Sequence, residues 1–170
     1  MTNRVTGMAA ATAAVLMLVG CAQAADQDRA VEKTQPGLTI AEAKRVAQGV
    51  EDSIVAKLPE SMVASVDQRA TGVLMRCGPD REYQWTGLTV VTLTESTSPE
   101  SVIREVLEAY ADDDELRPRD VTDSVGPAVQ LLGPYNSGYI VDPRTDDSVN
   151  VASFSPCFDL SEGSSPSIEY

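Results

Sequence analysis

The sequence predicts an α+β domain in which two helices pack on one face of an antiparallel β-sheet. Two segments carry apolar residues at helical spacing behind a capping signal, and the segments around them read as strands. The strand candidates are joined by turns too short for a parallel crossover. The expected order is α-β-β-α-β-β-β-β with one disulfide, in a chain of 170 residues that suits one domain.

The first helix is predicted to begin at a capping box. Thr39 is a hydroxyl residue followed three positions later by Glu42, so that each side chain can bond the other's backbone N–H. Apolar residues then recur every three or four positions as far as Leu58, which places one stripe against a core. Pro59 ends the pattern.

The second helix is predicted to begin at Ser98-Pro99-Glu100. This run has a cap residue, a proline at the first helical position and an acid that the helix dipole favours. Apolar residues at helical spacing follow as far as Tyr110, and the acidic run 112–115 marks the end of the helix.

The strands are predicted from extended apolar segments bounded by turn residues. Between the helices, residues 63–77 form a segment interrupted near 70–72, and residues 83–94 return after a turn at 78–80. The alternation in this second segment changes phase around Gly87, which suggests a bulge. Four shorter strands and two turns are expected after the second helix: strands at 116–121, 128–132, 138–141 and 149–154, and turns at 133–137 and 142–147.

Cys77 and Cys157 are predicted to form a disulfide. They are the two cysteines that remain once Cys21 is set aside, and an exported setting favours their oxidation. The alternative is a redox or metal-binding thiol pair, but the chain has neither a Cys-x-x-Cys motif nor a histidine. The bond would place the end of the last strand beside the turn at 78–82.

Residues 1–20 are predicted to be a lipoprotein signal peptide. Arg4 precedes an apolar run at 8–19, which is too short to span a bilayer as a helix. Residues 18–21, Leu-Val-Gly-Cys, look like a lipobox, in which cleavage between Gly20 and Cys21 leaves a cysteine that carries diacylglycerol and acyl chains such as palmitate. The alternative is ordinary signal cleavage after residues 22–24, Ala-Gln-Ala, which would discard Cys21.

The expected organisation follows from this anchor. Residues 21–37 form the lipidated N-terminus and a flexible tether, residues 38–158 the α+β domain, and residues 159–170 a loose C-terminal tail. We expect localisation at the cell membrane, lipid-anchored on the extracytoplasmic face. The expected partners are the lipid bilayer, through acylated Cys21, and an unidentified protein or envelope ligand. The net charge of −13 and the lack of a basic cluster exclude nucleic acid.

No catalytic motif is present, and we expect no enzyme activity, no cofactor and no metal site. The absence of histidine excludes Ser-His-Asp and Cys-His nucleophiles and His metal sites. The acidic residues at 112–115 and 142–147 can ligate Ca²⁺ in principle, but a helix end and a turn also account for them.

The expected function is that of a non-enzymatic binding or envelope-maintenance module. Tyr135 and Tyr139 are candidates for a binding surface, whereas Tyr83 and Trp85 are expected in the core. Two alternatives stay open. One is a carboxylate-dependent cell-wall hydrolase, which needs two acids facing one another across a cleft. The other is a carrier of an apolar ligand, which needs a cavity between helices and sheet.

The lipobox, residues 83–87 (Tyr-Gln-Trp-Thr-Gly) and residues 154–158 (Phe-Ser-Pro-Cys-Phe) together resemble the small surface lipoproteins of actinobacteria, of the LppA-like sort. This resemblance spans roughly the whole precursor, although only the lipobox is a specific motif. It implies an exported, membrane-tethered α+β domain with one disulfide. It carries over no catalytic residues.

Overall fold

The computed structural model describes residues 33–79 and 81–170. The predicted signal peptide, Cys21 and most of the predicted tether lie outside these residues. The described part contains two α-helices, an antiparallel sheet of eight strands and the Cys77–Cys157 disulfide, which confirms the predicted fold class. The elements in chain order are α1 (Ile40–Ala56), the short 3₁₀ helix η1 (Glu60–Met62), β1 (Val63–Gln68), β2 (Val73–Arg76), β3 (Glu82–Leu93), α2 (Pro99–Ala109), β4 (Arg117–Asp120), β5 (Val129–Leu132), β6 (Gly138–Thr145), β7 (Ser148–Phe154) and β8 (Phe158–Asp159).

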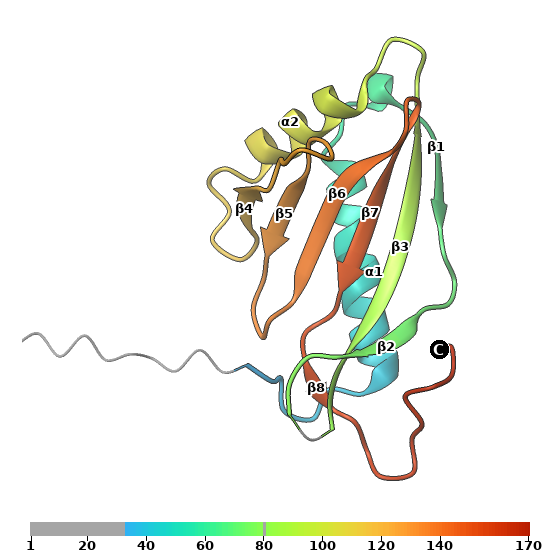
Figure 1. The fold of residues 1–170 in the computed structure, drawn as a ribbon, viewed down its shortest axis with the longest axis vertical. Helices are drawn as coiled ribbons and strands as arrows, with labels where there is room; N and C mark the ends of the chain where they lie inside the picture. The colour runs from blue at the N-terminus through green and yellow to red at the C-terminus, as the bar shows by residue number, and fades with distance from the viewer. Residues whose placement is uncertain (1–32, 80) are drawn as a thin grey trace, which may run out of the picture. The chain divides into compact units, whose positions relative to one another are not determined.

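The sheet has the strand order β1-β3-β7-β6-β5-β4, and β2 and β8 also pair with β3. All of these pairings are antiparallel. Helix α1 packs on β3 and β7, and α2 packs on β4, β5 and β6. In Figure 1, α1 lies behind β6 and β7. The domain therefore has two layers, one of helices and one of strands.

Both helices begin as the sequence predicts. The Thr39 side chain accepts a hydrogen bond from the backbone N–H of Glu42, whose carboxylate accepts one from the Thr39 N–H at 3.0 Å. At α2 the Ser98 hydroxyl accepts from the Ser101 N–H, and Pro99 opens the helix. The apolar residues buried by the helices are Ala43, Ala47 and Ile54 of α1 and Pro99, Val102, Ile103 and Val106 of α2.

Large side chains fill the space between the layers. Trp85 of β3 is fully buried and Tyr83 nearly so, as expected of core residues. The largest fully buried apolar or aromatic side chains are Trp85, Tyr110, Tyr139, Phe158, Ile54 and Leu131. Close packing of this kind gives the sheet one well-defined inner face.

The disulfide lies where the N-terminal segment of the described chain attaches to the domain. Cys77 and Cys157 have Cα atoms 6.1 Å apart and join the β2–β3 turn to the segment between β7 and β8. The Gln35 N–H donates to the Cys157 carbonyl at 2.7 Å, and the Thr34 hydroxyl donates to the Glu82 carboxylate at 3.2 Å. The chain is therefore attached to the domain from Thr34 onward, earlier than the predicted boundary at residue 37.

The C-terminal segment is held against the domain, so the expectation of a loose tail is wrong. Leu160 is buried, and its N–H donates to the Arg81 carbonyl at 2.8 Å. Gly72 and Tyr170 exchange two backbone hydrogen bonds, and the Trp85 indole N–H donates to the Tyr170 carbonyl at 3.3 Å. These bonds fix both ends of residues 160–170.

Two strand predictions also need correction. The predicted bulge at Gly87 is wrong, because β3 and β7 pair in unbroken register from Thr86 to Thr92. The predicted turn at 142–147 is too long: β6 runs to Thr145, and only two residues connect it to β7.

Candidate functional site

One face of the sheet is covered by neither helix, and we call it the open face. Side chains alternate between the two faces along a strand. In β3, Trp85 and Val91 are buried against the helix layer, so Leu88 and Val90 point to the open face. Both of these open-face residues are apolar and half-buried. The open face is therefore more apolar than an exposed sheet surface usually is.

The apolar side chains gather toward one end of the open face. Leu88 pairs with Ala152, which pairs with Ile140, and the next row joins Thr86 to Phe154. On one side β2 adds Val73, which pairs with Thr86, and Met75, which pairs with the buried Gln84. On the other side β5 adds Leu132 to one row and the polar Gln130 to the other. We call the following seven residues the apolar patch: Val73, Met75, Leu88, Leu132, Ile140, Ala152 and Phe154.

The other end of the open face is polar. Asp67 and Asn150 both pair with Val90, and Asn150 also pairs with Asp142. Partial burial raises the pKa of Asp142, while a hydrogen bond with Asn150 lowers it to a smaller extent. The last row contains Thr92 and its hydroxyl neighbours. The open face is therefore apolar in the rows of Thr86 and Leu88 and polar in the rows of Val90 and Thr92.

The apolar patch lies at the end of the sheet where the chain enters the domain, which we call the entry end. Phe154 precedes Cys157 by three residues, and the Cys157 carbonyl accepts the hydrogen bond from Gln35. In Figure 1 the described chain begins at this lower end, beside β8. At the β4 edge the exposed Arg117 and Arg119 continue the two apolar rows.

A buried carboxylate lies on the inner face, between α1 and the strands. Glu51 is 0% exposed. Its carboxylate accepts hydrogen bonds from Thr89 Oγ1 at 2.6 Å, from Gln68 Nε2 at 3.1 Å and from the Ser153 hydroxyl. These donors belong to β3, β1 and β7, so one carboxyl group connects the helix to three strands. A buried polar group needs such partners to be tolerated.

The surroundings of Glu51 disfavour its charge. Burial raises the pKa of Glu51 most, its three hydrogen bonds lower it to smaller extents, and the charge of Asp52 raises it slightly. Burial and then the charge of Glu51 raise the pKa of Tyr139. Gly87 makes room for the group, because a Cβ there would lie 2.7 Å from Glu51 Oε1.

We expect the Glu51→Gln variant to change how stability depends on pH. The unfolded chain releases the Glu51 proton near the ordinary value, but the folded protein holds it to higher pH. Between the two pKa values the folded state binds more protons, so the free energy of unfolding of the wild type falls as pH rises. Glu51→Gln lacks this fall, because the neutral amide does not titrate, and the Thr89 and Ser153 hydroxyls can turn to suit it.

Urea unfolding across pH 4 to 8 measures this effect, with Glu42→Gln as the control on the same helix. Hydrogen bonds from Thr39 lower the pKa of Glu42, so its contribution to stability has the opposite sign: it is present above the ordinary pKa and is lost as pH falls. Identical pH profiles for wild type and Glu51→Gln would contradict the interpretation.

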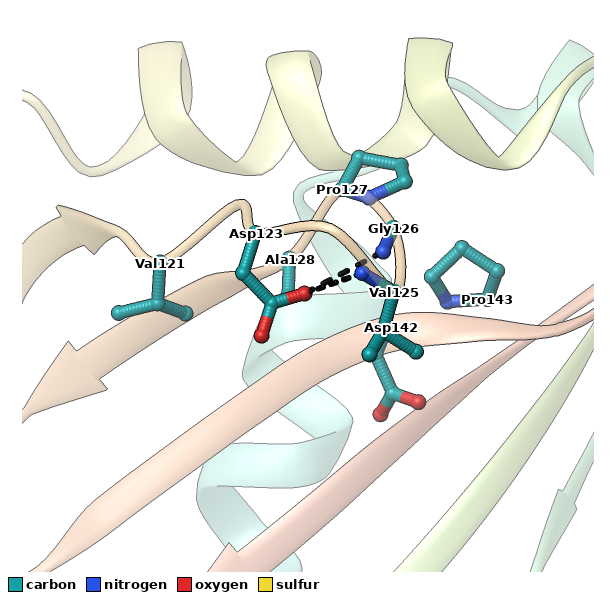
Figure 2. A pocket seen from close by; sticks show the side chains of 8 residues that line it. All are labelled: Val121, Asp123, Val125, Gly126, Pro127, Ala128, Asp142 and Pro143. Carbon is teal, nitrogen blue, oxygen red and sulfur yellow. Dashed lines mark hydrogen bonds between the residues drawn. The ribbon is translucent and has the colours of Figure 1, made fainter.

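A pocket of about 310 Å³ lies at the polar end, where the β4–β5 loop meets β6. Its two acids are Asp123 and Asp142. The Asp123 carboxylate accepts from the N–H groups of Val125 and Gly126 at 2.7 and 3.4 Å. Figure 2 shows this carboxyl group turned toward its own loop, while that of Asp142 points away from the loop. The two do not face one another as acid and base of a hydrolase must.

The acidic runs serve as turn and helix-end residues. Asp113 Oδ1 accepts from the N–H groups of Glu115 and Leu116, at 3.0 and 2.8 Å. Asp147 accepts from the Thr145 hydroxyl at 2.6 Å. Within residues 33–79 and 81–170, no group of three or more His, Cys, Asp or Glu side chains is placed to hold a metal ion.

The predicted binding surface of Tyr135 and Tyr139 is wrong. Tyr139 is 1% exposed, because it lies on the inner face of β6 against the helices. Tyr135 is half-buried in the β5–β6 turn, where its carbonyl accepts from the Cys157 N–H at 2.8 Å. The two rings therefore do not form one surface.

Comparison with known proteins finds no matching family model, no similar curated protein and no similar solved structure. In the part of the chain that the structure describes, neither helix is long and apolar enough to cross a bilayer. The open face and the buried Glu51 network are the two features that the sequence analysis does not predict. Glu51 had a detectable signal, since it lies four residues after Ala47 and three before Ile54, inside the buried stripe.

Proposed function

We propose that this chain is an exported lipoprotein, anchored through Cys21 at the extracytoplasmic face of the cell membrane, whose domain is a non-enzymatic binding module. The observation that carries the binding role is the open face with its apolar patch. The observation that carries the anchor is the Leu-Val-Gly-Cys sequence at residues 18–21, at the end of an apolar run.

A binding role accounts for the apolar patch. An antiparallel sheet with one face toward solvent normally carries polar side chains on that face. Here Val73 is 49% and Met75 is 44% exposed, and half-buried apolar residues continue the surface across β3, β7 and β6. Apolar side chains gathered on one face in this way mark an interaction site more often than scattered exposed residues do.

The two other functions have less support. A hydrolase needs facing carboxylates, but Asp123 bonds its own loop and Asp142 points away from it. A carrier of an apolar ligand needs space between helices and sheet, where Trp85, Tyr110 and Phe158 are fully buried. The binding module is therefore the function that the geometry supports best.

Intact-mass analysis of the mature protein tests the anchor. We expect an N-terminus that begins at Cys21 and carries diacylglycerol and acyl chains. The Cys21→Ser variant is expected to lose this mass and to leave the membrane fraction, because serine cannot form the thioether. Ala22→Ser is the matched control, because it introduces serine at the position next to Cys21 and leaves the thiol in place. This variant should stay lipidated. An unmodified N-terminus at residue 25 would contradict the proposal, since it shows ordinary signal cleavage.

A further inference from the structure

The apolar patch lies at the end of the domain where the chain from the proposed anchor enters, and this points to the bilayer as its occupant. The chain is attached to the domain at Thr34 and Gln35, both at the entry end. The patch residue Phe154 is at this same end. The proposed lipid on Cys21 therefore joins the domain beside the apolar half of the open face rather than beside the polar half.

The length of chain before the domain keeps the bilayer within reach of the patch. Residues 21–32 number twelve and lie outside the described residues. Twelve residues span at most about 43 Å even when fully extended. A short linker of this kind raises the effective concentration of one binding surface at the other to the millimolar range. At that effective concentration, a patch with weak intrinsic affinity for lipid is sufficient to dock on the bilayer.

Charges of both signs lie around the apolar patch. Asp67 and Asp142 lie at the polar end, away from the entry end, whereas Arg69 and Glu169 line a hollow with Val73 and Leu88 of the patch. Beside the patch, Arg117 and Arg119 are exposed on β4. Glu82, at the entry end, accepts a hydrogen bond from Thr34. Docking by the patch therefore brings both arginines of β4 and the carboxylates of Glu82 and Glu169 toward the headgroups, so the apolar contact and the short linker carry the orientation rather than the charge.

We propose that the apolar patch docks on the surface of the bilayer that holds Cys21, an inference that rests on the proposed lipid anchor. Asp114 and Glu115, just before β4, line a hollow with Arg117 and the patch residue Leu132, so they limit how closely the β4 edge approaches anionic lipid. The β2 edge, where Val73 and Met75 are most exposed, enters the headgroup region more deeply. The domain lies with its open face on the membrane and its helix layer away from it.

Quenching by brominated lipid tests this docking. The mature lipidated protein is reconstituted in vesicles of phosphatidylglycerol and phosphatidylcholine, with and without dibrominated chains. One variant carries Met75→Trp in the patch, and its control carries Val46→Trp on α1, where the valine is 37% exposed. Trp85 is fully buried, and it contributes the same background emission to both variants. We expect bromine to reduce the emission of Met75→Trp and to leave Val46→Trp unchanged.

The outcomes separate the docking from the anchor. Intact mass first establishes lipid on Cys21, and its absence overturns the proposed function and the docking with it. If lipid is present but Met75→Trp and Val46→Trp are quenched equally or not at all, the docking alone is overturned. Protection of the patch in a dimer seen by sedimentation, without quenching, identifies a second copy as the occupant and also overturns it.

A second pair of variants tests the apolar chemistry. Leu88→Asn with Ile140→Asn, added to Met75→Trp, is expected to abolish the quenching, because both changes put amides into the patch. Thr92→Asn at the polar end, in the same background, is the matched control and should leave quenching intact. Thermal unfolding verifies that each variant is folded. Full quenching with both asparagines in place would overturn the role of the patch.

Discussion

Replacing Cys77 and Cys157 together by alanine is expected to lower the free energy of unfolding by about 4–5 kcal/mol. The bond closes a loop between residues 80 positions apart, and the chain-entropy model gives a loss of this size when such a loop is opened. Ordinary domains have a net stability of about 5–15 kcal/mol, so much of it is removed. The entry of the chain is affected too, since Gln35 bonds the Cys157 carbonyl.

Urea unfolding of the purified domain with its full mature sequence measures this loss. Wild-type protein treated with reductant is the matched control, because it opens the same loop without changing a residue, and it should lose a similar amount. An alanine pair as stable as the oxidised wild type would show that other contacts already hold residues 77 and 157 together.

The Gly87→Ala variant is expected to lose about 1–3 kcal/mol of stability, the usual cost of overfilling a packed interior. The added Cβ would lie 2.4 Å from Trp85 Cζ3 and 2.7 Å from Glu51 Oε1. Both of these side chains are fully buried and have little space to move into. The methyl group must therefore displace either the indole or the hydrogen-bonded carboxylate.

Gly49→Ala is the matched control for this prediction. Gly49 lies in α1 with nothing within 4 Å of its added Cβ, so alanine there is expected to stabilise the protein by about 0.5–1 kcal/mol through helix propensity. Chemical unfolding of both variants gives the comparison. A Gly87→Ala variant as stable as wild type would mean that the contacts around Glu51 relax freely.

Local signals were sufficient for most of the secondary structure. The capping box at Thr39 and the Ser98-Pro99 start define the helix beginnings in the sequence itself, and the structure has both caps. The cysteine pair was also predictable from the sequence, because Cys77 and Cys157 are the two cysteines that remain once Cys21 is set aside. The C-terminal segment could not be predicted, since its fixed position depends on bonds to Gly72 and Arg81, which are distant in sequence.

The sequence analysis does not predict the open face, because it assumes that a strand carries apolar residues on one face only. In β3 the apolar residues change from odd positions, as at Trp85, to even ones, as at Leu88 and Val90. The predicted bulge at Gly87 rests on this change. The register is unbroken, so the change instead shows apolar residues on both faces. Thr89 then occupies the inner face because it bonds Glu51.

Oxidative footprinting of Met75 in the native envelope shows whether the membrane covers the apolar patch. This side chain is 44% exposed in the domain alone and is the most readily oxidised residue of the apolar patch. If the patch is covered in the anchored protein, Met75 is oxidised much more slowly in intact envelopes than in the released Cys21→Ser protein. Equal rates of Met75 oxidation in the two forms would show that the membrane does not cover the patch.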